Sequence, residues 1–146
     1  MDAKEREEIR IGQLTVRYLL EGHESNGSMA MFEFEVGQGA KVPAAHSHDA
    51  FEETLYGLEG ALTFTANGQK HELGPGDVLH VPRGVVHRFD NFSTGTTKTL
   101  AVITPGVLSP NYFREIAAVL KFAAGGPPDH AAIAAVMLRH GLTPAP

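Results

Sequence analysis

The sequence predicts an all-β sandwich or barrel that is followed by two short α-helices. Between residues 14 and 104, short segments of apolar and β-branched residues alternate with turns rich in glycine, proline and asparagine. No helical segment is interleaved with them, since helical spacing of apolar residues begins only after residue 109. Many short strands with tight turns and no helices between them are typical of an all-β domain.

The expected strands follow one another closely along the chain. Residues 29–36 alternate most clearly, with phenylalanines on one face and glutamates on the other, as in a half-buried strand. The pair Asn67–Gly68, between two strand-like segments, predicts a tight hairpin turn. The strands that we expect comprise residues 14–20, 29–36, 53–58, 61–65, 69–73, 78–81, 86–89 and 97–104.

The C-terminal part of the chain has the signals of two helices. Ser109 is suited to cap the first helix, with Pro110 at the first helical position. Residues 125–128, Gly-Gly-Pro-Pro, end that helix, and Asp129 can cap a second one that stops at Gly141. We expect both helices to pack on the barrel, because so short a segment would bury too little surface alone.

Length and composition favour one domain. The chain has 146 residues, which is enough for one domain with a hydrophobic core. Hydrophobic residues make up 42% and charged residues 20% of the chain, as is ordinary for a globular protein. Within this domain we expect a lead-in with the first strand in residues 1–28, the barrel in residues 29–105 and a helical extension in residues 106–146.

Charge and hydropathy argue against two classes of partner. The net charge is −5 and Lys and Arg form no run, so we expect no binding to nucleic acid. The longest apolar run, residues 131–138, is too short to span a bilayer. The charged residues 1–8 lack the apolar core of a signal peptide. We therefore expect a cytoplasmic protein with no membrane partner.

Three histidines and a glutamate form the candidate site. His46 and His48 are two residues apart, so on a strand both side chains point to the same face. Glu53 follows at a short distance, and His87 comes from a later strand. Because the chain has no cysteine, a metal must use nitrogen and oxygen ligands, which suit one divalent ion of Fe, Mn, Ni, Cu, Co or Zn. Four such ligands leave positions open for water, dioxygen or substrate.

The same residues resemble the two motifs of the cupin superfamily. The first motif has a Gly, a His-x-His pair, a Glu three or four residues later and a Gly, here Gly39, His46, His48, Glu53 and Gly60. The leading glycine lies one residue further from the histidines than in the strict pattern. The second motif is matched without deviation by Gly76, Pro82, Gly84, His87 and Asn91. The resemblance covers about residues 29–105.

The resemblance implies a jelly-roll β-barrel, often dimeric, with a metal ion near one open end. It implies His46, His48, Glu53 and His87 as the ligands. Glu52 is an alternative, because a three-residue spacing from the histidine pair selects it. We prefer Glu53 for its spacing to the following glycine, and neighbouring residues on a strand point to opposite faces, so only one of the two should ligate.

Three further residues are candidates for the pocket wall. Tyr56 could supply a hydroxyl to a ligand, and Phe89 could form part of an apolar wall. His80 lies in a strand-like segment, where a surface histidine that serves no ligand is the alternative interpretation. Glu53 could also act as a base that takes a proton from a substrate hydroxyl, if the pocket raises its pKa.

Within the superfamily, the segment from Phe51 to Asn91 resembles small single-domain proteins similar to quercetin dioxygenases. This implies a metal-dependent oxidoreductase that acts with dioxygen on a small, aromatic or enolic compound, and a homodimer. Two alternatives stay open, because one fold carries many chemistries. The same metal could catalyse isomerisation, cyclisation or decarboxylation without redox chemistry, or the barrel could bind a small molecule without turnover.

Overall fold

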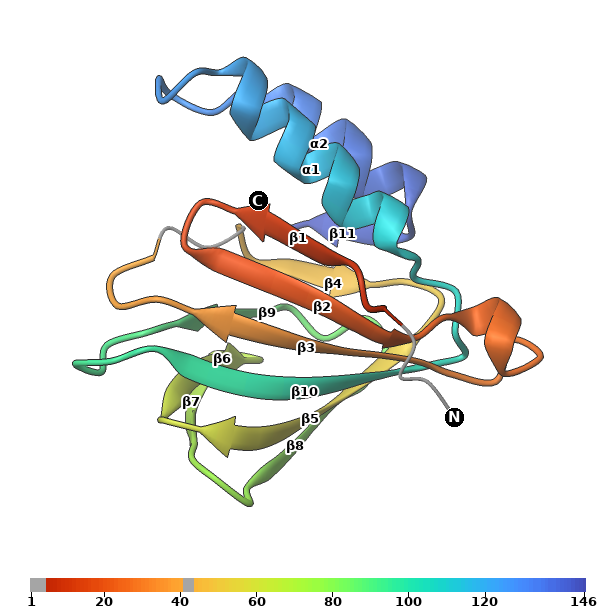
Figure 1. Ribbon diagram of the computed structural model, residues 1–146, viewed down its shortest axis with the longest axis vertical. Helices are drawn as coiled ribbons and strands as arrows, with labels where there is room; N and C mark the ends of the chain where they lie inside the picture. The colour runs from red at the N-terminus through yellow and green to blue at the C-terminus, as the bar shows by residue number, and fades with distance from the viewer. Residues whose placement is uncertain (1–4, 41–43) are drawn as a thin grey trace.

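The computed structural model describes residues 5–40 and 44–146; the first four residues of the predicted lead-in lie outside this part. Within the described residues, two antiparallel β-sheets face each other and two α-helices lie across one side of them (Figure 1). The prediction of an all-β fold with two C-terminal helices is confirmed. The sheets do not close into a continuous barrel and form a sandwich of the jelly-roll kind.

The larger sheet has six strands in the described residues, and each pairs antiparallel with its neighbours. Burial alternates residue by residue along its two central strands, which shows that one face is turned to the core. In spatial order the strands are β1 (Glu8–Ile11), β2 (Leu14–Leu20), β3 (Ala30–Val36), β10 (Thr97–Thr104), β5 (Glu52–Glu59) and β8 (Val78–Val81).

The smaller sheet has five strands among the described residues and contributes the three candidate histidines. The hairpin predicted at Asn67–Gly68 joins two of its strands, and both residues have positive φ, as such a tight turn requires. In spatial order the strands are β11 (Leu142–Pro144), β4 (His46–His48), β9 (His87–Asp90), β6 (Leu62–Ala66) and β7 (Gln69–Leu73).

The two helices begin where the capping residues predict. The side chain of Ser109 caps α1 (Pro110–Phe122) and that of Asp129 caps α2 (His130–Arg139), each accepting a hydrogen bond from a backbone N–H of the first turn. In the described part of the chain, no helix has the length and apolar character needed to cross a bilayer. A short 3₁₀ helix, Gly22–Glu24, occupies the predicted turn before β3.

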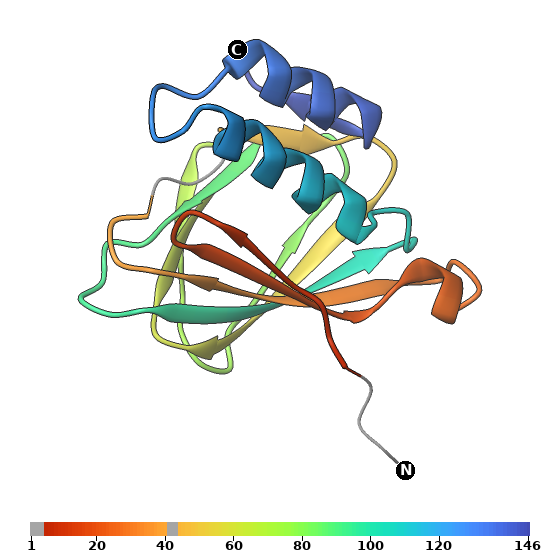
Figure 2. The same ribbon diagram turned by 45° about the horizontal axis from the view of Figure 1, so that its top comes forward.

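The helix pair covers the side on which the two sheets part. There, β1 is the edge strand of the larger sheet and β11 is the edge strand of the smaller one. Helix α1 packs on β1 and helix α2 packs on β11. Figure 2 shows the pair lying over the opening between the sheets. The C-terminal extension therefore forms a roof over the interior of the sandwich.

Three strands of the described residues lie outside the strand segments expected from the sequence: β4, for which the spacing of His46 and His48 had only assumed a strand, and the two edge strands β1 and β11. In β1, Ile9 and Ile11 are buried within a segment that reads as a charged lead-in. In β11, Leu142 pairs with His48 across the antiparallel ladder, so the end of the chain extends the sheet that holds the histidines. Both β1 and β11 are short edge strands, and the proline in β11 is tolerated at an edge.

Candidate metal centre

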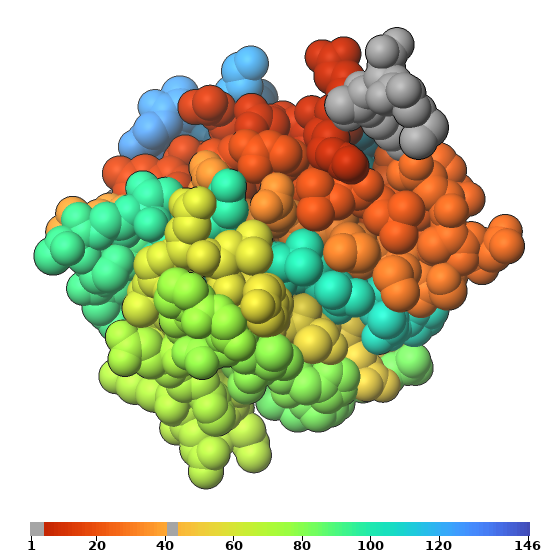
Figure 3. All heavy atoms as spheres, turned by 60° about the horizontal axis from the view of Figure 1, so that its bottom comes forward, coloured from red at the N-terminus to blue at the C-terminus, as the bar shows by residue number. Residues whose placement is uncertain are grey.

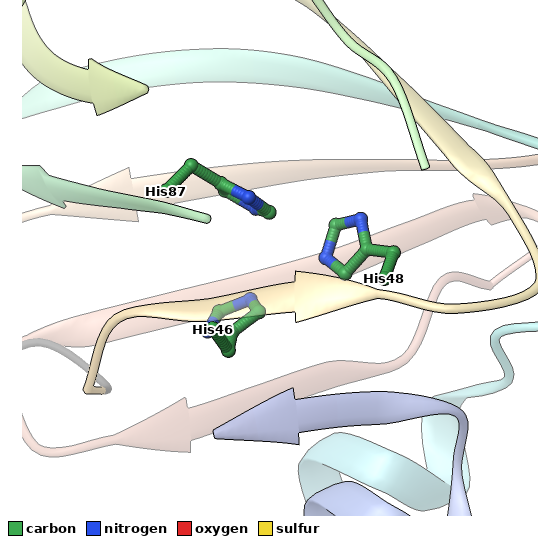
Figure 4. Close-up of side chains that lie close together, drawn as sticks. All are labelled: His46, His48 and His87. Atoms are coloured by element: carbon green, nitrogen blue, oxygen red, sulfur yellow. The ribbon is translucent and has the colours of Figure 1, made fainter. Parts of the chain in front are cut away.

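The fold brings three histidines together. His46 and His48 lie on β4, and His87 begins the neighbouring strand β9 directly opposite His46. The ring centroids are 5.2 Å apart for His46 and His48, 4.7 Å for His46 and His87, and 4.5 Å for His48 and His87. One ring nitrogen from each lies within 4.8 Å of the other two (Figure 4). Three nitrogens thus converge on one point, as predicted for a metal site.

Backbone contacts orient two of the rings. Nδ1 of His46 lies 2.9 Å from the carbonyl oxygen of Ala44, and Nδ1 of His87 lies 2.9 Å from that of Val85. A carbonyl oxygen only accepts, so each Nδ1 carries the proton and donates it, and each Nε2 keeps a free electron pair. This is the tautomer in which an imidazole ligates a metal through Nε2.

The third ring is packed rather than hydrogen-bonded. His48 is 2% exposed and stacks on Phe51, with 4.4 Å between centroids and 22° between planes. Its Nδ1 is buried and has no hydrogen-bond partner among the described residues. Figure 4 shows that Nε2 of this ring, and not Nδ1, faces His46 and His87, so Nε2 is the nitrogen that could ligate a metal ion together with the other two rings.

Burial keeps these imidazoles neutral. Burial, reinforced by the charge of His87, lowers the pKa of His46 to about 4. The pKa of His48 is lowered to about 2 by burial and by the charges of His87 and His46. Burial likewise lowers the pKa of His87. All three rings therefore offer electron pairs at neutral pH, and this donor set fits a transition-metal cation.

The two candidate glutamates point to opposite sides of β5. Glu53 is 9% exposed, and its Oε1 lies 3.7 Å from Nε2 of His87, although it is not part of the tight three-histidine group. Burial raises the pKa of Glu53 to about 7. Glu52 instead lies on the outer face, 2.9 Å from Nε2 of His80 and 3.6 Å from Nε of Arg83. The structure therefore places Glu53, and not Glu52, beside the histidines.

A cavity of about 60 Å³ adjoins the histidines. This is several times the ~10–15 Å³ that one water molecule needs, measured in the same way. Apart from the histidines, Glu53 and the hydroxyl of Tyr112, the described residues that line it are apolar, and none of them is Lys or Arg. The apolar lining consists of Leu14, Val16, Phe32, Phe34, Phe64, Phe89, Leu108, Phe113 and Leu142.

Of the three predicted pocket residues, the structure places only Phe89 in this cavity. Tyr56 is 42% exposed, and His80 pairs with Thr54 on the outer face of the larger sheet, the side seen in Figure 3. The expectation for these two residues is corrected by strand geometry. Tyr56 is three residues from Glu53, so the pleat turns the two side chains to opposite faces.

The C-terminal extension supplies part of the cavity that was not expected from the sequence. Leu108, Tyr112, Phe113 and Leu142 all line it, and Tyr112 is 4% exposed. Helical spacing marks Tyr112 as part of an apolar stripe, but such a stripe does not say which surface the helix covers. No local signal in the sequence would have identified these residues.

Two further residues of the second motif, Gly84 and Asn91, make backbone contacts that support the framework. The N–H of Gly84 donates to the carbonyl oxygen of His48 over 2.9 Å, which ties the second motif to the first. Gly84 has a φ of +78°, a conformation that glycine adopts at little cost. The buried Asn91 donates to the carbonyl oxygens of Val36 and Gly95, each over 2.8 Å. Gly84 and Asn91 therefore act on the framework and not on the cavity.

Comparison with known proteins agrees with this geometry. A protein-family profile described as "Cupin domain" matches residues 31–103, half of the chain. The chain belongs to the cupin family. This cupin is 30% identical over 116 residues to quercetin 2,3-dioxygenase of Bacillus subtilis. The match covers 80% of the chain but 34% of that enzyme, so the chain spans about one third of the relative's length.

Solved structures share the cupin fold. A predicted oxalate decarboxylase from Thermotoga maritima superposes with a TM-score of 0.61 at 24% identity, over 68% of this chain and 91% of that one. A polyketide cyclase from Streptomyces resistomycificus superposes with a TM-score of 0.58 at 24% identity, over 78% of this chain and 93% of that one. A cupin from Silicibacter pomeroyi, described as a sugar phosphate isomerase, superposes with a TM-score of 0.56 at 25% identity, over 64% of this chain and 60% of that one. The differing descriptions of these proteins show that the fold alone does not determine the reaction.

Proposed function

We propose that this cupin is a metal-dependent oxidoreductase of the dioxygenase type that acts on a small aromatic or enolic compound. The observation that carries the proposal is the group of three neutral, buried imidazoles beside Glu53 in an otherwise apolar cavity. The similarity to quercetin 2,3-dioxygenase supports the reaction class.

One divalent transition metal, Fe, Mn, Ni, Cu, Co or Zn, would be held by His46, His48 and His87, with Glu53 as a fourth ligand. When bound, it would supply Lewis acidity and, in a redox-active form, the means to react with dioxygen. The histidines would hold it without proton loss at neutral pH, because burial already keeps them unprotonated.

Glu53 would act as the base. Its raised pKa, about 7, places its proton exchange near neutral pH, where general acid–base catalysis is most effective. A substrate hydroxyl beside the histidines could pass its proton to the Glu53 carboxylate. The surrounding apolar walls would keep water away from the reacting centre.

The cavity lining favours a planar, largely apolar substrate. Five phenylalanine rings from the residues that the structure describes form much of the wall. The ring centroids of Phe34 and Phe89 are 5.2 Å apart, and those of Phe32 and Phe113 are 5.1 Å apart. Such rings pack well against another aromatic ring. Among the described lining residues no cation is placed to bind a phosphate group, which disfavours phosphorylated substrates.

Oxygen uptake tests the proposal. Protein reconstituted with each metal would be mixed with quercetin or catechol in an oxygen electrode, with the metal-free protein as the control. Substrate-dependent oxygen uptake that needs the metal is the expected result. Conversion that proceeds equally well without oxygen would favour the non-redox alternative, and tight binding without conversion would favour a binding protein.

A further inference from the structure

Two buried tyrosines near the roof of the cavity differ in how their hydroxyls are satisfied. The hydroxyl of Tyr18 donates to the carbonyl oxygen of Leu108 over 2.8 Å. Tyr112 is just as deeply buried, yet its hydroxyl makes no hydrogen bond with any described residue. The oxygen of Tyr112 is not among the fully enclosed atoms without a partner, which are His48 Nδ1 and Thr97 Oγ1 in the described residues, so it borders the cavity, where a ligand can reach it.

Tyr112 and the histidines border one common cavity. Tyr112 lines the same cavity as His48 and Glu53. The charge of Glu53 also contributes to the raised pKa of Tyr112, after the larger effect of burial. The phenol therefore stays protonated at neutral pH and can only donate its proton to an acceptor or accept a hydrogen bond, without carrying charge.

The ring of Tyr112 is held in position from two sides. It packs edge-on against Phe113, with 5.0 Å between ring centroids and 70° between ring planes. It also packs edge-on against His140, with 5.6 Å between centroids and 65° between planes. His140, after the end of α2, is in turn paired with Glu115 of α1. These contacts fix the ring through both helices, so the hydroxyl is offered to the cavity from a preorganised position.

We propose that Tyr112 is a specificity-determining residue that donates a hydrogen bond to an oxygen atom of the substrate. This inference rests on the proposed function. It narrows the substrate to compounds that carry at least two oxygen atoms, of which a catechol is a simple aromatic example. One oxygen would serve the metal site and the other would meet Tyr112.

Tyr112 lies outside residues 31–103, the part of the chain that matches the cupin profile. It belongs to the roof that the C-terminal extension adds to the sandwich. The extension would therefore set substrate choice as well as close the cavity, while the histidines and Glu53 would supply the shared chemistry.

Substitution of one hydroxyl tests the proposal. Tyr112→Phe and the control Tyr56→Phe, which removes an exposed hydroxyl from the outer face, would be loaded with Co(II) and titrated without oxygen. Catechol, with two neighbouring oxygens, and phenol, with one, are the probes, followed by the visible absorption of the cobalt. We expect Tyr112→Phe to bind catechol about tenfold more weakly and phenol as wild type does, with metal content and melting temperature unchanged. Tyr56→Phe should match wild type throughout.

Each other result contradicts the proposal. Equal catechol affinity in Tyr112→Phe and wild type, or an equal loss for both probes, would show that the hydroxyl does not recognise a second oxygen. A marked fall in melting temperature would show that the hydroxyl has a structural partner. Failure of the cobalt-loaded wild type to bind catechol would overturn the proposed function, and this inference with it.

Discussion

Oε1 of Glu53 lies 3.7 Å from Nε2 of His87, although the two residues belong to different sheets. Glu53 comes from β5 of the larger sheet and His87 from β9 of the smaller one. The pair spans the interior of the sandwich, so the candidate site is complete only when the sheets pack together. Metal binding would consequently be coupled to folding.

Replacing Glu53 should change how metal affinity depends on pH. Because the pKa of Glu53 is raised to about 7, protons compete with the metal for its carboxylate below that pH. In wild type we expect the affinity to fall about tenfold per pH unit between pH 7 and 5. Glu53→Gln should bind metal more weakly at pH 7.5 but with little change down to pH 5, measured by competition with a chromophoric chelator. The same slope in both proteins would rule out Glu53 as a ligand.

The inner and outer histidines should respond differently to substitution. His87→Ala removes one of three convergent nitrogens and should weaken metal binding by more than the roughly 10–100-fold that loss of an outer partner costs. His80→Ala, on the outer face, should leave the affinity within about twofold of wild type, as expected of a surface site. Equilibrium dialysis of both variants decides the matter, and equal losses would contradict the ligand assignment.

The metal-free protein should lose stability in mild acid. Burial lowers the pKa of His46 and His48 from 6.5, so below pH 6.5 the unfolded chain takes up protons that the folded one excludes. Glu53 acts in the opposite direction, since its raised pKa costs stability as the pH rises from 4.5 to 7. Burial also lowers the pKa of His87, so the histidines together outweigh the one glutamate. The free energy of unfolding should fall by at least about 1–2 kcal/mol between pH 7 and 5.

Urea unfolding of the chelator-treated protein at those two pH values measures this difference. His80→Ala is the control, because it removes a histidine of the outer face and leaves the three buried ones in place. An unfolding midpoint at pH 5 equal to or above that at pH 7 would contradict the assigned burial of the histidines.

Asn91 should matter for stability and not for metal binding. Asn91→Ala leaves the buried carbonyl of Val36 without its donor and removes the acceptor of the Ser93 N–H, 2.9 Å away. We expect a loss of about 2–3 kcal/mol in the free energy of unfolding, with an unchanged metal-to-protein ratio in the folded fraction. Denaturant unfolding and elemental analysis test the two parts, and loss of metal at full stability would instead place Asn91 at the site.

The sequence was most informative where local pattern and spacing coincide. Alternation and turn residues predicted the long strands, and the His46, His48 and His87 pattern predicted a cluster that the structure brings together. It was least informative at the edges, since the isoleucines of β1 and the three residues of β11 are too few to show a period.

Strand parity alone is enough to correct the expectation for Tyr56. This residue is an odd number of positions from Glu53, so both cannot face the cavity from the same strand. Tyr112 is different, because its place in the cavity depends on how α1 docks across the two sheets, a long-range packing result. The homodimer and the cytoplasmic location stay predictions.

Metal content tests the central claim most directly. Purified protein would be incubated with each divalent metal at pH 7.5, desalted and analysed by elemental mass spectrometry beside His48→Ala. We predict close to one metal ion per chain in wild type and little in the variant. Retention of no metal by wild type, or equal retention by both proteins, would contradict it.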